Sequence, residues 1–167
     1  AAASSVYAFE HQVATIEWAR AVLRNSDLTY HKLTRAQLTA LAPDFPLARL
    51  LDNSGLGKVD NFLAPQIPPG EKEAAALGLT AQDKAGIGGG LPAMMALVAK
   101  TPLSTLKAFM AAHFLSRYAD VLPSDIDQAN FDFYGKVLNG AEQQRPRWKR
   151  SIETTESELG EVLGKAY

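Results

Sequence analysis

Cysteine is absent from this chain of 167 residues, and histidine occurs three times. Without cysteine there is no disulfide framework, no thiolate nucleophile and no cysteine-held metal. A zinc site needs three or four convergent ligands, whereas His11, His31 and His113 fall on three separate expected elements. We therefore predict no metal-binding residue in this chain. The lack of cysteine does not identify the compartment, since a secreted protein of this size can do without disulfides.

An excess of charge of one sign is also missing. The chain has 17 Lys and Arg against 18 Asp and Glu, a net charge of −1. Nothing in that balance favours nucleic acid or an anionic membrane as a partner. The longest apolar run, Leu91–Ala99, is broken by Pro92 and is far shorter than the roughly 20 residues of a membrane span. We predict neither nucleic-acid binding nor membrane insertion by this segment.

Catalytic motifs are lacking as well. No Gly-x-Ser-x-Gly elbow occurs. The carboxylates of Asp125 and Asp127 stand two positions apart, which points them in different directions on a helix, so we interpret them as solvated charges near a helix start. The segment 86–90 is rich in glycine but lacks the Lys-Ser/Thr of a phosphate loop, so we interpret it as a loop that lets Pro92 open a helix. Within it, Gly88–Gly90 is expected to be a flexible joint. We predict no catalytic and no cofactor-binding residue here.

What the sequence does contain is helical periodicity. Hydrophobic residues make up 47% and charged residues 21% of the chain, as in ordinary globular proteins. The predicted fold class is all-α, an irregular multi-helix bundle with at most one short strand or hairpin. We expect residues 1–167 to form a single helical domain, with 57–91 as an irregular Gly/Pro-rich insertion.

Individual elements are marked in the first half by periodicity and by caps. An apolar stripe predicts a helix over residues 5–24. Thr34 with Gln37, and Thr80 with Asp83, have the spacing of capping boxes at two helix starts. Residues 58–63 are the best strand candidate.

In the second half, Thr101 and Pro102 resemble an N-cap and a first helical residue. A five-turn helix should follow, and Pro123 should break it before a new helix with Asp127 at its third position. Met110 and Phe114 belong to the stripe that marks the first of these helices. On the second, Ile126, Phe133 and Val137 are expected to face inward.

The last helix is predicted from about Pro146, with Trp148, Ile152, Leu159 and Val162 or Leu163 on its apolar side. Glu161 and Lys165 would form an i,i+4 ion pair on it. The helical rhythm persists to the final residues, and the first residues have no leader pattern, so we expect a longer parent chain.

Arg145–Arg150 is the most concentrated basic cluster. It could recognise a carboxylate or an acidic surface through arginine forks. Alternatively, Trp148 docks into the core and the cations make structural ion pairs. We favour ion pairing, because cations at a helix N-terminus oppose the helix dipole and need compensating partners, which we expect elsewhere in the parent chain. The role of this cluster stays open.

The segments that carry a family resemblance are Tyr30–Leu38, Leu41–Phe45, Thr101–Lys107, Phe131–Tyr134, Leu138–Gly140 with Pro146–Arg150, and Leu159–Tyr167. Their order resembles the N-terminal peptidase region of the neprilysin-like zinc metallopeptidases. The resemblance extends over nearly the whole chain. The zinc-binding His-Glu-x-x-His motif of that family does not occur in this sequence, so no site residue is carried over.

The resemblance implies the N-terminal lobe of a bacterial zinc metalloendopeptidase that cleaves oligopeptides. Such a lobe would cap the catalytic cleft, limit the size of its substrates and be inactive by itself. The zinc and the catalytic domain that is this lobe's partner would belong to the rest of the parent chain, and the localisation would be extracytoplasmic, periplasmic or secreted.

Two other hypotheses remain. The chain could be a stand-alone helical binding module without catalytic activity, or an unrelated helical enzyme that uses an external cofactor.

Overall fold

The computed structural model describes residues 2–163 and is mainly helical, as predicted. The chain divides between Ala108 and Phe109 into two compact units, and the described residues of each are treated separately. That the whole chain forms a single domain, with an irregular insertion at 57–91, stays a prediction. The expected Glu161–Lys165 ion pair lies outside the described residues, because Lys165 is not among them.

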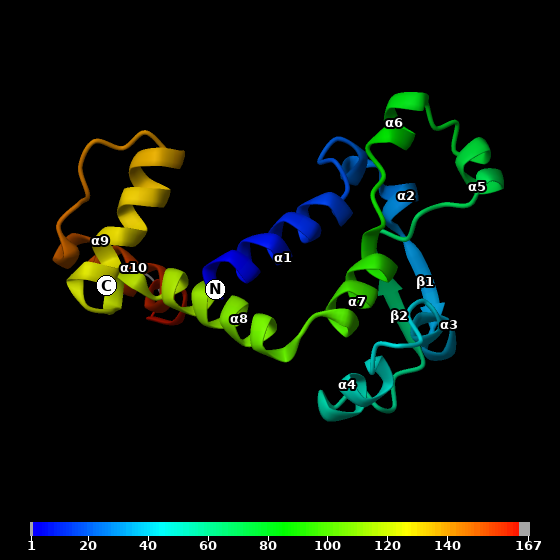
Figure 1. Ribbon diagram of the computed structural model, residues 1–167, viewed down its shortest axis with the longest axis horizontal. Helices are drawn as coiled ribbons and strands as arrows, with labels where there is room; N and C mark the ends of the chain where they lie inside the picture. Colours follow the sequence, from blue (N-terminus) through cyan, green and yellow to red (C-terminus); the bar gives the residue numbers. More distant parts are fainter. Residues whose placement is uncertain (1, 164–167) are drawn as a thin grey trace. The chain divides into compact units, whose positions relative to one another are not determined.

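The first unit is built from short helices around a two-stranded sheet (Figure 1). Its elements are α1 (Ala2–Ile16), η1 (Val22–Arg24), α2 (Ser26–Thr29), β1 (His31–Thr34), α3 (Arg35–Ala40), α4 (Leu47–Asn53), β2 (Asn61–Ala64), α5 (Glu71–Ala76), α6 (Ala81–Ala85), α7 (Gly90–Lys100) and the start of α8 (Leu103–Arg117). The strands pair antiparallel, with His31 opposite Ala64 and Thr34 opposite Asn61. The strand predicted over residues 58–63 corresponds to β2, which begins and ends slightly later in the sequence.

Two clusters of buried side chains hold the first unit together. The larger lies between the sheet, α3, α4 and α7, and its buried members are Leu38, Ala42, Leu47, Leu51, Ala64 and Met95. The smaller consists of Trp18, Val22 and Leu28, with Leu77, Leu79 and Ile87 packed against it. Burial of each such large apolar side chain contributes about 1.5–3 kcal/mol.

The predicted helix over 5–24 is shorter in the structure, because the chain turns around Trp18. α1 ends at Ile16, and the Trp18 indole N–H then donates to the carbonyl of Gly88 over 3.0 Å. Gly90 has a φ of +58°, and a Cβ there would lie 1.9 Å from the Gln66 carbonyl oxygen. The glycine-rich segment is thus closely packed rather than a flexible joint.

Both predicted capping boxes are present. The Thr34 hydroxyl accepts from the Gln37 backbone N–H, and Thr80 does the same with Asp83. Thr101, by contrast, was predicted to cap α8, but its hydroxyl donates to the Leu97 carbonyl and so ends α7. The Pro102 carbonyl accepts the first helical bonds of α8 instead.

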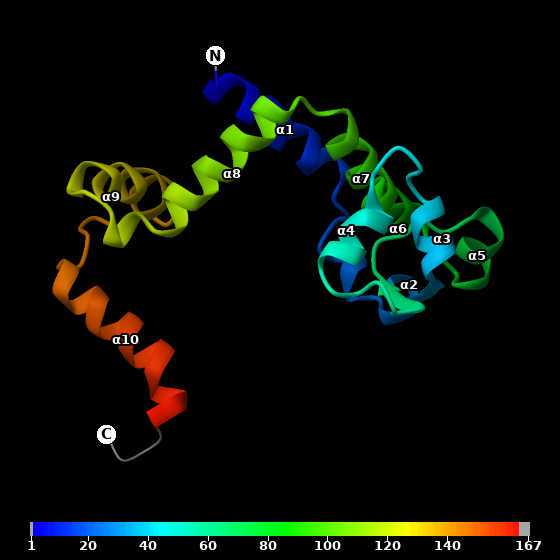
Figure 2. The same cartoon turned by 90° about the horizontal axis from the view of Figure 1, so that it is seen from below.

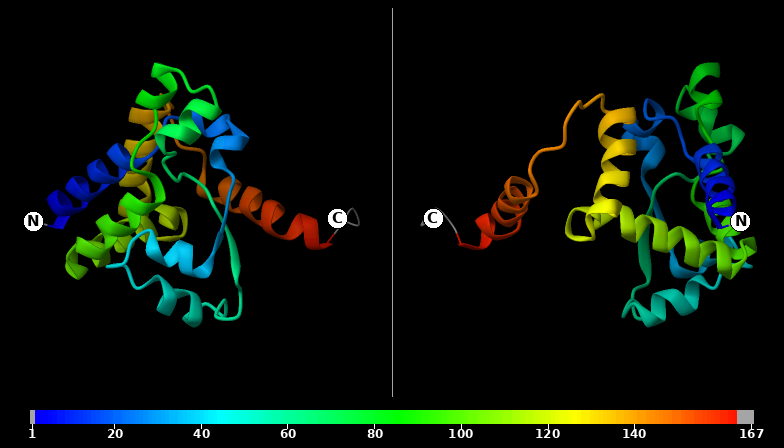
Figure 3. Two further views of the ribbon diagram at one scale, coloured as in Figure 1. Left: turned by 90° about the vertical axis from the view of Figure 1, so that its right-hand side faces the viewer. Right: turned by 60° about the vertical axis from the view of Figure 1, so that its left-hand side comes forward.

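The second unit contains the end of α8, η2 (Ala119–Val121), α9 (Ser124–Asn130), η3 (Phe131–Leu138) and α10 (Arg147–Leu163). η3 is a π-helical continuation of α9. A connector over residues 139–146 joins it to α10, and Figure 2 shows α10 leading away from α9 at the end of this connector. The two further views in Figure 3 agree on this arrangement.

Few side chains of the second unit are buried. Of its described residues, Ala119 and Asp127 fall in the buried class. The prediction that Phe133 and Val137 face inward is wrong for this chain, since each is more than half exposed. Met110 and Phe114, on the predicted stripe of α8, are also more than half exposed. The periodicity correctly marked an apolar face, but within the described residues no interior covers it.

Candidate functional site

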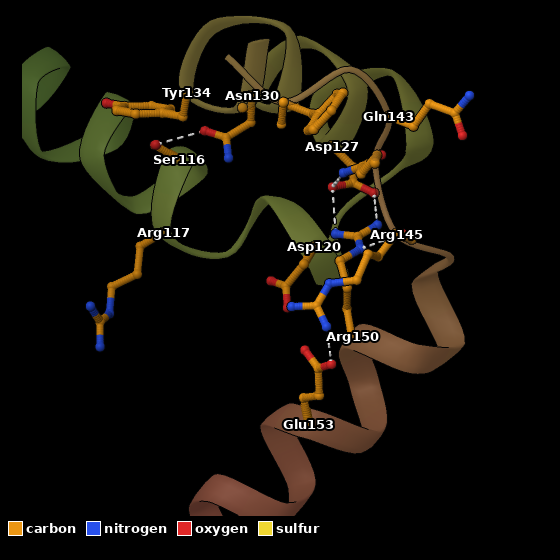
Figure 4. Close-up of a pocket in the computed structure, with 14 residues that line it drawn as sticks. Ser116, Arg117, Asp120, Asp127, Asn130, Tyr134, Gln143, Arg145, Arg150 and Glu153 are labelled. Atoms are coloured by element: carbon orange, nitrogen blue, oxygen red, sulfur yellow. Dashed lines mark hydrogen bonds and ion pairs between the residues drawn. The ribbon is translucent and has the colours of Figure 1, made fainter. Parts of the chain in front are cut away.

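A charged hollow of about 500 Å³ lies on the second unit, between α9, η3 and the start of α10. Three cations, Arg117, Arg145 and Arg150, and three anions, Asp120, Asp127 and Glu153, lie along it (Figure 4). These charges sum to zero. The hollow therefore has no net charge of one sign with which to attract an ionic ligand.

Asp127 is the buried carboxylate of this hollow, with 7% of its surface exposed. It accepts two hydrogen bonds from the Arg150 guanidinium, one to each carboxylate oxygen, at 3.0 and 2.6 Å. A third comes from the Gln144 side-chain amide at 2.9 Å. This is the bidentate fork in which arginine and carboxylate match each other's planar geometry. We refer to these two residues as the Asp127–Arg150 pair.

The pair sets the protonation state of both groups. Hydrogen bonds from Arg150 lower the pKa of Asp127 from its usual value, burial opposes this shift, and the Gln144 amide and the charges of Arg150 and Arg147 support it. The hydrogen bonds to Asp127 raise the pKa of Arg150. Asp127 is therefore a carboxylate and Arg150 a cation throughout the neutral range, so neither is suited to proton transfer there.

Further contacts hold the start of α10 in place. The Arg150 Nε donates to the Arg145 carbonyl over 3.1 Å, which fixes the end of the connector. An Arg147 guanidinium nitrogen donates to the Leu122 carbonyl over 2.9 Å, and Arg145 pairs with Glu153 in the second turn of α10. These partners offset the unfavourable placement of cations at a helix N-terminus. Figure 4 shows Arg117, by contrast, pointing away from Asp127.

The sequence predicted part of this arrangement. Structural ion pairing of the Arg145–Arg150 cluster agrees with the contacts of Arg145 and Arg150. The interpretation of Asp127 as a solvated charge near a helix start is wrong, because Arg150 covers its carboxylate. The expectation that the cations find partners elsewhere in the parent chain is wrong for these two arginines. The helix dipole indicated that these cations need a compensating partner, but it did not identify that partner as Asp127.

Trp148 does not dock into a core within the described residues. Its side chain is 62% exposed, and the Lys149 ammonium lies 5.3 Å from the centre of its ring. Ile152, Leu159 and Val162 on the same helix are exposed as well. The apolar side of α10 was thus predicted correctly, but no described residue buries it.

The three histidines stay apart in the structure. His11 lies on α1, His31 on β1 and His113 on α8, where its ring lies 4.3 Å from that of Phe109. The His31 Nε2 lies 3.5 Å from a Glu73 carboxylate oxygen. Among the described residues, no group of three or more histidine, aspartate or glutamate side chains could hold a metal ion. These donors do not fit zinc, and that the chain binds no metal stays a prediction.

The fold is mainly helical, and the charged side chains of the hollow bind one another and so connect α9, the connector and α10. The model of peptidase family M13, for its N-terminal part, matches residues 1–167. The chain belongs to this family, and its resemblance to the N-terminal region of the neprilysin-like metallopeptidases is confirmed.

A solved structure has the same fold. It is the cryo-electron microscopy structure of the zinc metalloprotease Zmp1 of Mycobacterium tuberculosis in an open state, with 24% sequence identity and a TM-score of 0.75. The match covers 99% of this chain and 23% of that protease, so the present chain spans about a quarter of the length of the protein it resembles. A comparison with curated proteins finds no match.

Proposed function

We propose that this chain is the N-terminal, non-catalytic lobe of a bacterial zinc-dependent metalloendopeptidase that cleaves oligopeptides. The observation that carries the proposal is the match of the M13 family over residues 1–167. The donor set of the described residues does not fit zinc, which is consistent with a metal held by the rest of the parent chain. No step of peptide hydrolysis is therefore placed on a residue of this chain, which by itself is inactive.

In this proposal the lobe caps the catalytic cleft and limits the size of the peptides that reach it. Its partner is the catalytic domain of the same parent chain, and the parent works outside the cytoplasm, in the periplasm or as a secreted enzyme. None of the helices in the described part is long and apolar enough to cross a membrane. The exposed apolar side chains of the second unit supply surface for contact with that domain.

The capping role is tested with two substrates and two variants of the parent enzyme. The substrates are a short peptide and the same sequence within a folded protein, and the parent should cleave only the peptide efficiently. Asp127→Asn should loosen α10 and raise the rate on the folded substrate relative to the peptide, whereas Asp132→Asn, which affects an exposed pair with Lys136, should not. If both variants keep the wild-type ratio of rates, the lobe does not limit substrate size.

The alternative is a stand-alone helical binding module, and the exposed apolar side chains of the second unit are also what such a module would offer to a partner. The reading frame of the parent gene separates the two functions. A His-Glu-x-x-His motif downstream would eliminate the stand-alone module, whereas a natural stop codon just after Tyr167 would favour it.

A further inference from the structure

The polar side of α10 contacts the rest of the second unit. Successive residues of an α-helix are rotated by about 100°, so Arg150 projects about 200° around the helix axis from Trp148. Arg150 contacts Asp127 on α9, and Arg147 contacts the Leu122 carbonyl. Helices usually pack on their neighbours through an apolar stripe, and here the polar contacts turn that stripe away from α9.

The apolar stripe of α10 follows a regular spacing. Trp148, Ile152, Thr155, Leu159 and Val162 alternate by four and three residues, which confines them to a stripe about 80° wide. We call these five residues the seam. Its four apolar members are between 46% and 78% exposed. Side chains at this spacing fit between those of one facing helix that crosses at about 20°.

Without a covering partner, α10 would be poorly stabilised. The helix has 17 residues, and most of the stability of a helix in a protein comes from packing of its amphipathic face. The contacts described for α10 lie in its first two turns, at Arg147, Arg150 and Glu153. The C-terminal half of the seam is therefore the part that most needs a partner.

We propose that the seam docks on a helix of the catalytic part of the parent chain. The identity of this occupant rests on the proposed function, and its size fits, since more than three quarters of the matching protease lies outside the region shared with this chain. Lys149 flanks the seam at its N-terminal end, and Glu156 and Glu158 flank its C-terminal half. The facing helix should thus carry acidic residues beside Trp148 and basic residues beside Leu159.

The Asp127–Arg150 pair has a positioning role in this arrangement. It fixes α10 from the side opposite the seam, so it sets the direction in which the seam points without contacting the partner. This explains why an arginine cluster stands at a helix start that electrostatics alone would disfavour.

Hydrogen exchange measured by mass spectrometry on residues 148–162 tests the proposal, in the complete parent enzyme and in this chain alone. Exchange should be slower in the parent by about 100-fold, because packing of the seam suppresses local opening of the helix. Ile152→Glu in the parent should restore much of the fast exchange. Thr154→Glu, about 240° around the helix from Trp148, is the matched control and should leave the protection in place.

Equal exchange in the parent and in the isolated chain would overturn the proposal, and this comparison needs no variant to fold. A dimer of the isolated chain that Ile152→Glu abolishes would also overturn it, since the occupant would be a second copy. Peptide hydrolysis is measured on the same parent samples. If the seam is protected but the parent does not hydrolyse peptides, the proposed function is refuted and the docking of the seam stands. If the parent hydrolyses peptides but the seam is not protected, the docking is refuted and the proposed function stands.

Discussion

Asp127 shows how one side chain can join segments that lie far apart in the sequence. Its carboxylate brings together α9, the connector through Gln144 and α10 through Arg150. A buried carboxylate with three donors is stable only while all of them are present, because any donor lost leaves a charge without a partner in a poorly solvated place.

Replacement of Asp127 by asparagine should destabilise the second unit. The amide is neutral and offers one acceptor oxygen, so Arg150 keeps its charge and loses half of its fork. We expect a loss of about 1.5–3 kcal/mol in the free energy of unfolding, the range for hydrogen bonds to charged groups. Urea denaturation followed by circular dichroism measures this loss.

Asp132→Asn is the matched control. Asp132 also pairs with a cation, Lys136 at 2.6 Å, but both side chains are about half exposed. Exposed pairs of this kind contribute little. The control should denature like the wild type, and equal losses for the two variants would show that burial of the Asp127–Arg150 pair has no energetic consequence.

The same pair makes stability depend on pH in a defined direction. The pKa of Asp127 is lower in the folded chain than its usual value of 3.8. Its stabilising contribution is therefore complete above about pH 4, the ordinary range for aspartate, and is lost as the pH falls through the folded-state pKa. The difference in unfolding free energy between wild type and Asp127→Asn should shrink below about pH 4. A difference that grows on acidification would mean that Asp127 is protonated in the native chain.

At the scale of the element, the caps were predictable and the tertiary interruptions were not. Thr34 and Thr80 determine helix starts through neighbours three residues away, which the sequence displays directly. Trp18 ends α1 by reaching the Gly88 carbonyl, a contact across 70 positions that no local pattern encodes. β1 was not predicted, because its strand pairing depends on β2 almost thirty residues later.

The Thr34 cap gives a local prediction. Thr34→Ala removes the acceptor for the Gln37 N–H and should cost about 1 kcal/mol of stability in the first unit. Thr34→Ser keeps the hydroxyl and should restore most of it. Thermal unfolding of the three proteins provides the measurement, and a serine variant as unstable as the alanine variant would refute the role of the hydroxyl.

The glycine-rich junction gives a second prediction at this scale. A methyl group at Gly90 would overlap the Gln66 carbonyl at a backbone conformation that already favours glycine. We expect Gly90→Ala to cost at least about 2 kcal/mol, more than the strain of a left-handed residue alone. Gly70 has open space around its position, so Gly70→Ala should cost less than about 1 kcal/mol. Chemical denaturation should separate the two variants clearly.

At the scale of the whole molecule, the contrast between the two units is the informative feature. The first unit has two buried clusters, whereas most apolar side chains of the second unit are exposed. The sequence predicted which residues of α8, η3 and α10 are apolar, but periodicity cannot say whether the surface that covers them belongs to the same chain segment. For that reason the predictions that Phe133 faces inward and that Trp148 docks into a core were wrong.

The candidate site was predictable to a similar degree. Net charge, the missing cysteines and the scattered histidines were all visible in the sequence, and they explain why the described donors do not fit zinc. The ion pair of Asp127 with Arg150 could not be predicted from the sequence. Several carboxylates lie near helix starts, and the path of the connector determines which of them Arg150 reaches.

We propose that this chain is a lobe of an M13 peptidase and that the metal and the catalytic groups lie in the rest of the parent chain. Zinc content and hydrolysis of a fluorogenic peptide, measured side by side on the purified chain and on the complete parent enzyme, test it most directly. We expect one zinc ion per parent molecule with hydrolysis that a chelator abolishes, and neither zinc nor hydrolysis for the chain alone. Chelator-sensitive hydrolysis by the isolated chain would contradict it.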